Sequence, residues 1–101
     1  MRHCFLIPNY NGAHFIEKTI SNFINLTSDP VFVVDDSSTD DSVNLLSRLD
    51  GVFLIRREVN GGFASAVNSG LKYVKSRGYH LATITNSDVT LDSESLSSVV
   101  K

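Results

Sequence analysis

A short apolar run passes directly into an acidic one in the segment Val31-Phe32-Val33-Val34-Asp35-Asp36-Ser37-Ser38-Thr39-Asp40-Asp41. The same change occurs later, where residues 81–85 run into Asn86-Ser87-Asp88. Short apolar runs bounded by polar clusters are typical of buried strands. In a parallel α/β sheet, ligands bind outside the carboxyl ends of the strands. The two clusters therefore predict a site for a metal ion, a polyhydroxylated ligand, or both.

Apolar strands and stretches of helical periodicity alternate along the rest of the chain. We expect strands at residues 3–7, 31–35, 52–55 and 81–85, and helices at 13–26, from 40 or 41 to about 50, at 62–77 and from 93 to 101. The apolar positions that mark these helices are Ile16, Ile20, Phe23 and Ile24, then Val43, Leu46 and Leu49, then Phe63, Val67, Leu71 and Val74, and finally Leu96, Val99 and Val100.

This alternation predicts an α/β fold with a Rossmann-like parallel sheet, right-handed crossovers and helices on both faces. A doubly wound strand order of 3-2-1-4 places the ends of the first and fourth strands beside the switch point, where ligands bind. Those ends carry Asn9-Tyr10-Asn11 and Asn86-Ser87-Asp88, and the Asp35-Asp36 pair lies next to them. Three polar loops are thus expected to meet at one edge of the sheet.

Composition restricts the class of protein. A chain of 101 residues can form one domain with a modest core, and 42% hydrophobic and 20% charged residues are ordinary for a globular protein. The net charge of −2 predicts no basic face, which argues against nucleic acid as a partner. No apolar run approaches the roughly 20 residues that a membrane span needs. We expect Cys4 to be a buried reduced thiol, and the scattered His3, His14 and His80 predict no histidine–metal site.

The acidic loop has a structural and a functional interpretation. Aspartate, serine and threonine at a strand-to-helix turn accept hydrogen bonds from the first backbone N–H groups of the helix, which accounts for Asp40 and Asp41. Capping does not account for Asp35 and Asp36, two adjacent carboxylates that close an apolar strand. We therefore predict a functional role for Asp36, and with less support for Asp35.

Two further polar motifs are also open to both interpretations. Asn60-Gly61-Gly62 precedes a helix rich in small residues. It permits either a tight turn with close helix packing or the approach of the backbone to a phosphate or a sugar. Asn86-Ser87-Asp88 is short enough to be a surface turn. Its position after an apolar strand suits Mg²⁺ or Mn²⁺, which proteins hold with one or two carboxylates together with the phosphates of a substrate.

Four motifs in register carry a family resemblance. They are Ile7-Pro8-Asn9-Tyr10-Asn11-Gly12, Val33-Val34-Asp35-Asp36-Ser37-Ser38-Thr39-Asp40, Asn60-Gly61-Gly62-Phe63-Ala64 with Asn68 and Gly70, and Asn86-Ser87-Asp88. From about residue 3 to residue 95 the chain resembles the amino-terminal, nucleotide-sugar-binding half of a family 2 glycosyltransferase of the GT-A fold. The Asn-Gly-Gly-Phe-Ala run is most similar to that of rhamnosyltransferase-like members.

The resemblance implies a UDP-, dTDP- or GDP-linked sugar donor and hexosyl transfer to an acceptor hydroxyl, as in polysaccharide biosynthesis. The residues that it assigns to the donor site are Pro8 and Tyr10 in the base pocket, Asp36 on the base or ribose, Gly62 and Asn68 in the wall beside the ribose and diphosphate, and Asn86, Ser87 and Asp88 in place of an Asp-x-Asp motif. Because Asn86 replaces the first acid, Asp88 is the implied ligand of Mn²⁺ or Mg²⁺.

The same resemblance implies that half of the catalytic domain lies beyond this sequence. The carboxylate base of an inverting enzyme and most of the acceptor site are expected after residue 101, so residues 1–101 are interpreted as the donor-binding half of a truncated domain that does not turn over alone. We expect a location in the cytoplasm or at the inner face of the membrane. The uncovered edge of a truncated sheet also favours homo-oligomers.

Three alternatives stay open. A non-catalytic nucleotide-binding or assembly module is favoured by the short chain and by Asn86. A receiver-type signalling domain also has acidic strand ends and needs Mg²⁺, but its acidic pair normally follows the first strand, and the lysine it needs on a late strand is absent here. A dinucleotide-binding domain requires Gly-x-Gly-x-x-Gly after the first strand, where this chain has residues 8–12, Pro-Asn-Tyr-Asn-Gly.

Overall fold

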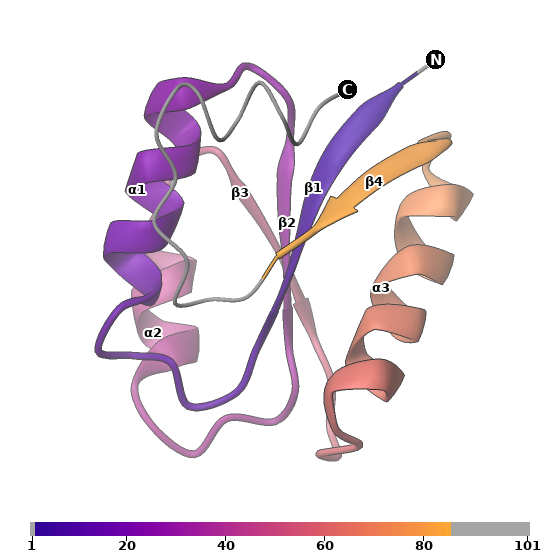
Figure 1. The fold of residues 1–101 in the computed structure, drawn as a ribbon. Coiled ribbons are helices and arrows are strands. Elements are labelled where there is room, and N and C mark those ends of the chain that lie inside the picture. The colour runs from indigo at the N-terminus through magenta and orange to yellow at the C-terminus, as the bar shows by residue number, and fades with distance from the viewer. Residues whose placement is uncertain (1, 86–101) are drawn as a thin grey trace.

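The computed structural model describes residues 2–85 of the chain, which form an alternating series of strands and helices (Figure 1). The elements are β1 (His3–Asn9), α1 (Ile16–Leu26), β2 (Val31–Asp35), α2 (Ser42–Ser47), β3 (Val52–Arg56), α3 (Phe63–Ser76) and β4 (Leu81–Ile84). The helix expected from residue 93 to 101 lies outside the described residues. Within the described part, no helix has the length and apolar character to cross a membrane.

The four strands form one parallel sheet in the order β3-β2-β1-β4, which confirms the predicted topology. In the register of the sheet, Phe5 lies opposite Val31, and Val31 lies opposite Val52. On the other side of β1, His3 lies opposite Leu81. Because all the strands run in the same direction, their carboxyl ends share one edge of the sheet (Figure 1). The loops that begin at Asn9 and Asp35 meet there.

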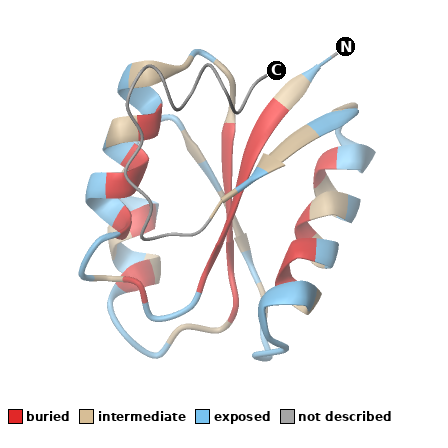
Figure 2. Cartoon of the chain, viewed as in Figure 1, coloured by how far each residue is buried: buried red, intermediate tan, exposed pale blue. Residues whose placement is uncertain are grey.

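Helices cover both faces of the sheet, as predicted. Alternate side chains of β1 and β2 point to opposite faces because the side-chain period of a strand is two residues. One core therefore joins these strands to α1 and α2, and a second joins them to α3. The first core comprises Phe5, Ile7, Ile16, Ile20, Phe23, Val31, Val33 and Leu46, and the second comprises Cys4, Leu6, Phe32, Val34, Ala66 and Val74. The two central strands are buried along almost their whole length (Figure 2).

The structure corrects several details of the predicted helices. The first helix begins at Ile16 rather than residue 13, because the carbonyl of Gly12 accepts hydrogen bonds from the N–H groups of Phe15 and Ile16 in a turn. The second helix ends at Ser47, short of the predicted end near residue 50. Two of the apolar positions that mark helices in the sequence are exposed in the structure, since Phe63 is 58% exposed and Ile24 is 38% exposed.

Cys4 is buried, as the sequence predicts, and of the three histidines His3 has a structural role. The thiol of Cys4 is free and buried, and burial together with the nearby negative charge of Asp29 raises its pKa to about 11. Nδ1 of His3 lies 2.8 Å from Oδ2 of Asp29, and Nε2 lies 2.8 Å from the hydroxyl of Thr83, so this ring joins β1 to β4 and to the loop before β2. His14 and His80 are exposed.

Two loops at the carboxyl edge are joined by Asn11 and Asp40. Asn11 has a positive φ of 53°, a conformation that asparagine adopts more readily than most residues. Its Oδ1 accepts hydrogen bonds from the backbone N–H groups of Thr39 at 2.8 Å and Asp40 at 3.2 Å. In return, Oδ2 of Asp40 accepts one from the N–H of Ala13 at 3.0 Å, and Oδ1 caps α2 through the N–H of Ser42. The β1–α1 and β2–α2 loops are thus held against each other.

Close packing of α3 on the sheet depends on Gly70. A Cβ atom at this position would lie 2.6 Å from Cγ2 of Val34 and 2.8 Å from Cδ1 of Leu6. Both of these side chains are fully buried and cannot move aside without displacing other core atoms. Gly70 is therefore needed for close contact between α3 and the sheet. Close helix packing was one of the two interpretations of the Gly-rich segment and the helix that follows it.

We predict that Gly70→Ala destabilises the chain by about 1–2 kcal/mol. Overpacking a core costs roughly 1–3 kcal/mol, and contacts as short as 2.6 Å place this substitution at about 2–3 kcal/mol, of which the better helix propensity of alanine offsets about 1 kcal/mol. Urea unfolding followed by circular dichroism measures the difference. Lys72→Ala, on an exposed position of the same helix, is the control and should change the free energy of unfolding by less than about 0.5 kcal/mol. A Gly70→Ala variant as stable as the wild type would contradict the close contact.

The hydrogen bonds of Asp40 also predict a dependence of stability on pH. Burial alone raises the pKa of Asp40, but the hydrogen bonds from Ser42 and Ala13 outweigh it, so the net pKa is lowered. The folded chain then binds this proton less readily than the unfolded chain. The stabilisation is therefore present above the usual aspartate pKa of about 3.9 and is lost as the pH falls below it.

We expect Asp40→Asn to be less stable than the wild type at pH 7, with a difference that shrinks at pH 3. Urea unfolding at the two pH values gives the comparison. Asp50→Asn removes an equal charge from an exposed residue and serves as the control. An Asp40→Asn difference of the same size at both pH values would show that the charge of Asp40 does not stabilise the two loops.

Candidate functional site

A hollow of about 300 Å³ opens at the carboxyl edge of the sheet, where β1 and β2 end and α3 begins. The residues that line it are Pro8, Asn9, Tyr10, Asp36, Asn60, Gly62, Phe63 and Ala66. They come from three segments far apart in the sequence, which the strand order 3-2-1-4 brings together. This is the place where ligands bind in open α/β sheets, and four of the predicted site residues (Pro8, Tyr10, Asp36 and Gly62) line it.

Asp35 and Asp36 point to opposite sides of the strand end and have different partners. Oδ1 of Asp35 accepts hydrogen bonds from Nδ2 of Asn9 at 3.0 Å and from the hydroxyl of Ser38 at 2.7 Å. Its Oδ2 accepts one from the backbone N–H of Ser38 at 3.0 Å. These contacts tie the end of β1 to the start of the acidic loop. Asp35 is therefore a structural residue of the described site, and it does not line the hollow.

Asp36 is the carboxylate that lines the hollow. Its side chain is only 5% exposed, and Oδ1 accepts a hydrogen bond from Nη1 of Arg57 at 2.7 Å in an ion pair. The backbone N–H of Gly61 lies 3.2 Å from both oxygens, and the N–H of Gly62 donates to Oδ2 at 2.9 Å. A buried carboxylate needs such partners because removing its charge from water is costly. Asp36 consequently fixes the start of α3 relative to the end of β2.

One buried polar atom beside the hollow has no partner in the described part of the chain. Oδ1 of Asn9 is inaccessible to solvent and makes no hydrogen bond with residues 2–85, whereas Nδ2 of the same side chain donates to Asp35. Buried polar groups without a partner are uncommon in folded proteins and call for an explanation. Asn9 also lines the hollow, but its Oδ1 is buried and is not exposed there.

Two aromatic side chains form the apolar part of the hollow. Tyr10 is 51% exposed and Phe63 is 58% exposed, and both line it. Exposed rings at a site of this kind offer apolar surface to a planar ligand. Phe63, one of the apolar positions that mark the third helix in the sequence, is the first residue of α3, and the buried side of that helix is formed by Ala66, Val67, Gly70 and Val74.

Gly62 is required for its backbone conformation. Its φ of +90° lies in a region that side-chain-bearing residues rarely adopt, and no heavy atom lies within 4 Å of a Cβ built on it. The conformation directs the N–H of Gly62 to Asp36 while its carbonyl accepts the first hydrogen bond of α3, from Ala66. Asn68, which the sequence also assigned to the site, is exposed on α3 and does not line the hollow.

The described residues do not form a metal site. Within residues 2–85, no cluster of three or more histidine, cysteine, aspartate or glutamate side chains could hold a metal ion. Asp35 and Asp36 both have protein donors, as described above. The predicted metal ligand Asp88, with Asn86 and Ser87, lies outside the described residues. The prediction that this chain binds Mn²⁺ or Mg²⁺ therefore depends on the sequence of residues 86–88 alone.

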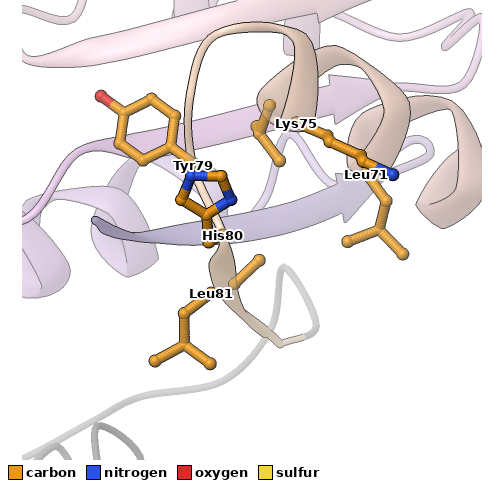
Figure 3. A pocket seen from close by; sticks show the side chains of 7 residues that line it. Leu71, Lys75, Tyr79, His80 and Leu81 are labelled. Atoms are coloured by element: carbon orange, nitrogen blue, oxygen red, sulfur yellow. The ribbon is translucent and has the colours of Figure 1, made fainter. Parts of the chain in front are cut away.

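Of two further hollows, one is remote from this group of residues and the other adjoins it through Ser37 and Arg57. One, of about 220 Å³, is formed where α3 ends and β4 begins, with Leu71, Lys75, Tyr79, His80 and Leu81 around it (Figure 3). It lies at the amino end of β4, so it is remote from the loops at the carboxyl edge. The other is an open depression lined by Ser37, Arg56, Arg57 and Glu58. Neither contains a buried carboxylate.

The sequence did not assign Arg57 to the site, nor four of the residues that line the hollow, namely Asn9, Asn60, Phe63 and Ala66. The guanidinium of Arg57 pairs with Asp36 and also donates from Nη2 to the hydroxyl of Ser65 at 2.7 Å. Arg57 is 21 residues from Asp36 in the sequence. The sequence does show a basic residue directly after the third strand, which places it at the same edge of the sheet as Asp36 and could have indicated an ion pair. The neighbouring Arg56 carries the same charge and is exposed, so the sequence does not distinguish the two.

Comparisons with known proteins give a consistent result. Residues 4–101 match the family described as glycosyl transferase family 2. Chondroitin synthase of Pasteurella multocida strain Pm70 is 31% identical over 87 residues, which are 81% of this chain and 9% of that protein. The UDP-N-acetylglucosamine--dolichyl-phosphate N-acetylglucosaminyltransferase of Methanococcus voltae is 26% identical over 99 residues, covering 82% of this chain and 39% of the relative. The chain thus spans less than half the length of either relative.

A solved structure has the same fold. Residues 1–349 of TarS from S. aureus superpose with a TM-score of 0.78 over 99% of this chain and 31% of the TarS chain, at 23% sequence identity. This likeness establishes the fold class that the sequence predicted, an α/β fold of the GT-A type with a parallel sheet in the order 3-2-1-4.

Proposed function

Because this chain belongs to glycosyl transferase family 2, we propose that it forms the donor-binding half of an enzyme that transfers a hexosyl group from a nucleotide-diphospho-sugar to an acceptor hydroxyl. The observation that carries the proposal is the hollow at the carboxyl edge of the sheet, with the buried carboxylate of Asp36 in its wall. Binding at such an edge is what the topology favours.

The chemistry of the hollow suits a nucleoside. Tyr10, Phe63 and Pro8 provide apolar surface for a planar base. The carboxylate of Asp36 in the wall of the hollow is a hydrogen-bond acceptor, and a base and a ribose both carry N–H or O–H donors. The volume of about 300 Å³ is at the lower end of the range for ligand pockets, which is consistent with one nucleoside and leaves the sugar outside.

The diphosphate and the metal are assigned to residues 86–88. We propose that Asp88 holds Mn²⁺ or Mg²⁺ together with the phosphate oxygens, and that Asn86 and Ser87 contribute to donor binding beside it. A metal ion in this place supplies Lewis-acid stabilisation of the charge on the departing diphosphate. The role of the described residues is to bind and orient the nucleoside. The carboxylate that deprotonates the acceptor in an inverting transfer is proposed to lie outside this chain.

Three nucleotides are candidates for the carrier of the donor sugar. The name of the Methanococcus relative specifies a UDP-linked sugar, which favours UDP. The Asn60-Gly61-Gly62-Phe63-Ala64 run instead favours a rhamnosyl donor of the dTDP-linked kind, by its similarity to rhamnosyltransferase-like members. GDP is also a candidate, because guanine, like uracil and thymine, carries a ring N–H that can donate a hydrogen bond. All three nucleotides therefore belong in the first test.

A non-catalytic nucleotide-binding module is the second candidate. The observation in its favour is Asn86, which removes one of the two acids expected in the metal-binding motif. Such a module binds the nucleotide with little response to metal. The two candidates therefore differ in the effect of metal on affinity.

We predict that the chain binds one of UDP, dTDP and GDP more tightly than the others, and more tightly with Mn²⁺ than without it. Isothermal titration calorimetry of each nucleotide, with and without Mn²⁺, makes the comparison. Asp88→Asn should lower the nucleotide affinity measured with Mn²⁺ about tenfold, because a metal contact is lost. The affinity measured without metal should not change. Asp50→Asn is the control for loss of charge.

Each outcome of this titration has a defined meaning. Nucleotide binding without any metal response would support the non-catalytic module. If circular dichroism shows a folded chain and none of the three nucleotides binds, the proposed donor site is wrong.

A further inference from the structure

The strand β3 lies at an edge of the sheet. Within the described part of the chain it pairs with β2 on one side and has no strand on the other. The backbone N–H of Arg57 donates to the carbonyl of Asp35 in β2 at 2.8 Å. Because backbone groups alternate in direction along a strand, those of Val52, Leu54 and Arg56 point to the free edge. Such a row of backbone donors and acceptors is a template for pairing with another strand.

The edge also carries an exposed aromatic ring. Phe53 is 54% exposed, and its ring stacks on that of Phe32, with centroids 5.0 Å apart and planes 24° from parallel. Phe32 is itself buried, so the ring of Phe53 is held in one position by the core of the chain. An ordered ring loses little conformational freedom when a partner covers it, and its burial removes apolar surface from water.

The two ends of β3 carry opposite charges. Asp50 lies in the turn just before the strand, Arg56 is the last residue of the strand, and both are exposed. Neither side chain has a hydrogen-bond or ion-pair partner among residues 2–85. An antiparallel strand of the same sequence brings the start of one β3 to the end of the other. Each Asp50 then meets an Arg56, and opposite charges across paired strands are stabilising.

We propose that two copies of this chain associate through their β3 edges, as an antiparallel pair centred on Phe53. In this register, Phe53 lies opposite Phe53 of the second copy and Val52 lies opposite Leu54. Arg56 lies beside the turn that carries Asp50. The outward backbone groups of residues 52 and 54 then face each other and form hydrogen bonds. Phe53 falls at a non-hydrogen-bonded position, where side chains on the two strands approach most closely.

Neighbouring registers are less favourable. A pair centred on Leu54 places the charge of Arg56 opposite the apolar Val52, and a pair centred on Val52 places Asp50 opposite Leu54. Both lose the two ion pairs of the proposed register. A charge at the end of an edge strand ordinarily discourages pairing. Here the opposite charge at the other end of the same strand removes that penalty in one register.

The proposed pairing leaves the candidate donor site open. None of the residues that line the hollow at the carboxyl edge belongs to β3 or to the turn before it. Because the two β3 strands run in opposite directions, the carboxyl edges of the two sheets lie at opposite ends of the joined sheet. The association is therefore independent of the proposed function.

The first test exchanges the two charges. Sedimentation equilibrium of the chain at about 0.05–1 mM measures the dissociation constant of the dimer. The variants are Arg56→Asp, Asp50→Arg and the double variant that carries both changes. Lys18→Asp and Glu17→Arg make the same changes of charge at exposed positions of α1 and are the matched controls. Circular dichroism reports whether each variant is folded.

We expect a dissociation constant between about 0.1 and 1 mM, as is typical of interfaces of small area. Each single reversal should raise it about tenfold, because like charges then meet at both ends of the paired strands. The double variant should return it to within about threefold of the wild type, and the two controls should leave it unchanged. The unfolding and calorimetric experiments that use Asp50→Asn refer to the monomer and are run below this concentration range.

A second test uses single cysteines to establish the register. Phe53→Cys places two thiols at a non-hydrogen-bonded pair whose Cα atoms lie about 4.5 Å apart, within the range that a disulfide spans. Leu54→Cys leaves its two thiols offset along the strands. Oxidation with glutathione disulfide followed by non-reducing electrophoresis should cross-link Phe53→Cys and leave Leu54→Cys monomeric. The wild type, whose Cys4 is buried, is the control.

Three results would overturn the inference. The first is a wild type that stays monomeric at about 1 mM. The second is a dimer that the single reversals do not weaken, or one that a folded double variant does not restore. The third is cross-linking of Leu54→Cys in preference to Phe53→Cys. None of these results affects the donor site, which the nucleotide titration tests separately.

Discussion

The arrangement of the site depends on one constraint: the carboxylate of Asp36 is buried and must have its charge balanced. It lies at the end of β2, where the segment after β3 and the start of α3 approach it, and each supplies donors. An unpaired carboxylate in this position would cost several kcal/mol. The ion pair with Arg57 and the N–H groups of Gly61 and Gly62 remove that cost, and in doing so they fix the relative positions of three segments.

The hollow is a consequence of the same arrangement. Because strand side chains alternate, Asp35 faces Asn9 and Ser38 while Asp36 faces α3, so the two charges do not share an environment. Close contact at Gly70 sets the distance between α3 and the sheet. The first residue of this helix, Phe63, lines the hollow together with Tyr10. The carboxylate of Asp36 and the aromatic rings of Tyr10 and Phe63 therefore line the same hollow as a result of how α3 packs on the sheet.

Much of this could be predicted from the sequence, for identifiable reasons. The central strands are short apolar runs ending in polar clusters, and strict alternation of strands and helices leaves few topologies, so the order of the sheet and the place of Asp36 at its carboxyl edge could both be predicted. Arg57 could not, because its partner lies 21 residues away and Arg56 has the same charge. The contact of the Gly61 N–H with Asp36 and the exposure of Phe63 depend on where α3 begins, which periodicity locates only within a few residues.

The most direct test of the account is a double-mutant cycle between Asp36 and Arg57. The free energies of unfolding of the wild type, Asp36→Asn, Arg57→Met and the double variant, obtained by urea titration, give the coupling between the two side chains. We expect a favourable coupling of about 1–3 kcal/mol, because the two residues share one buried network. Additive effects, with a coupling below about 0.5 kcal/mol, would contradict the claim that this ion pair holds the site together.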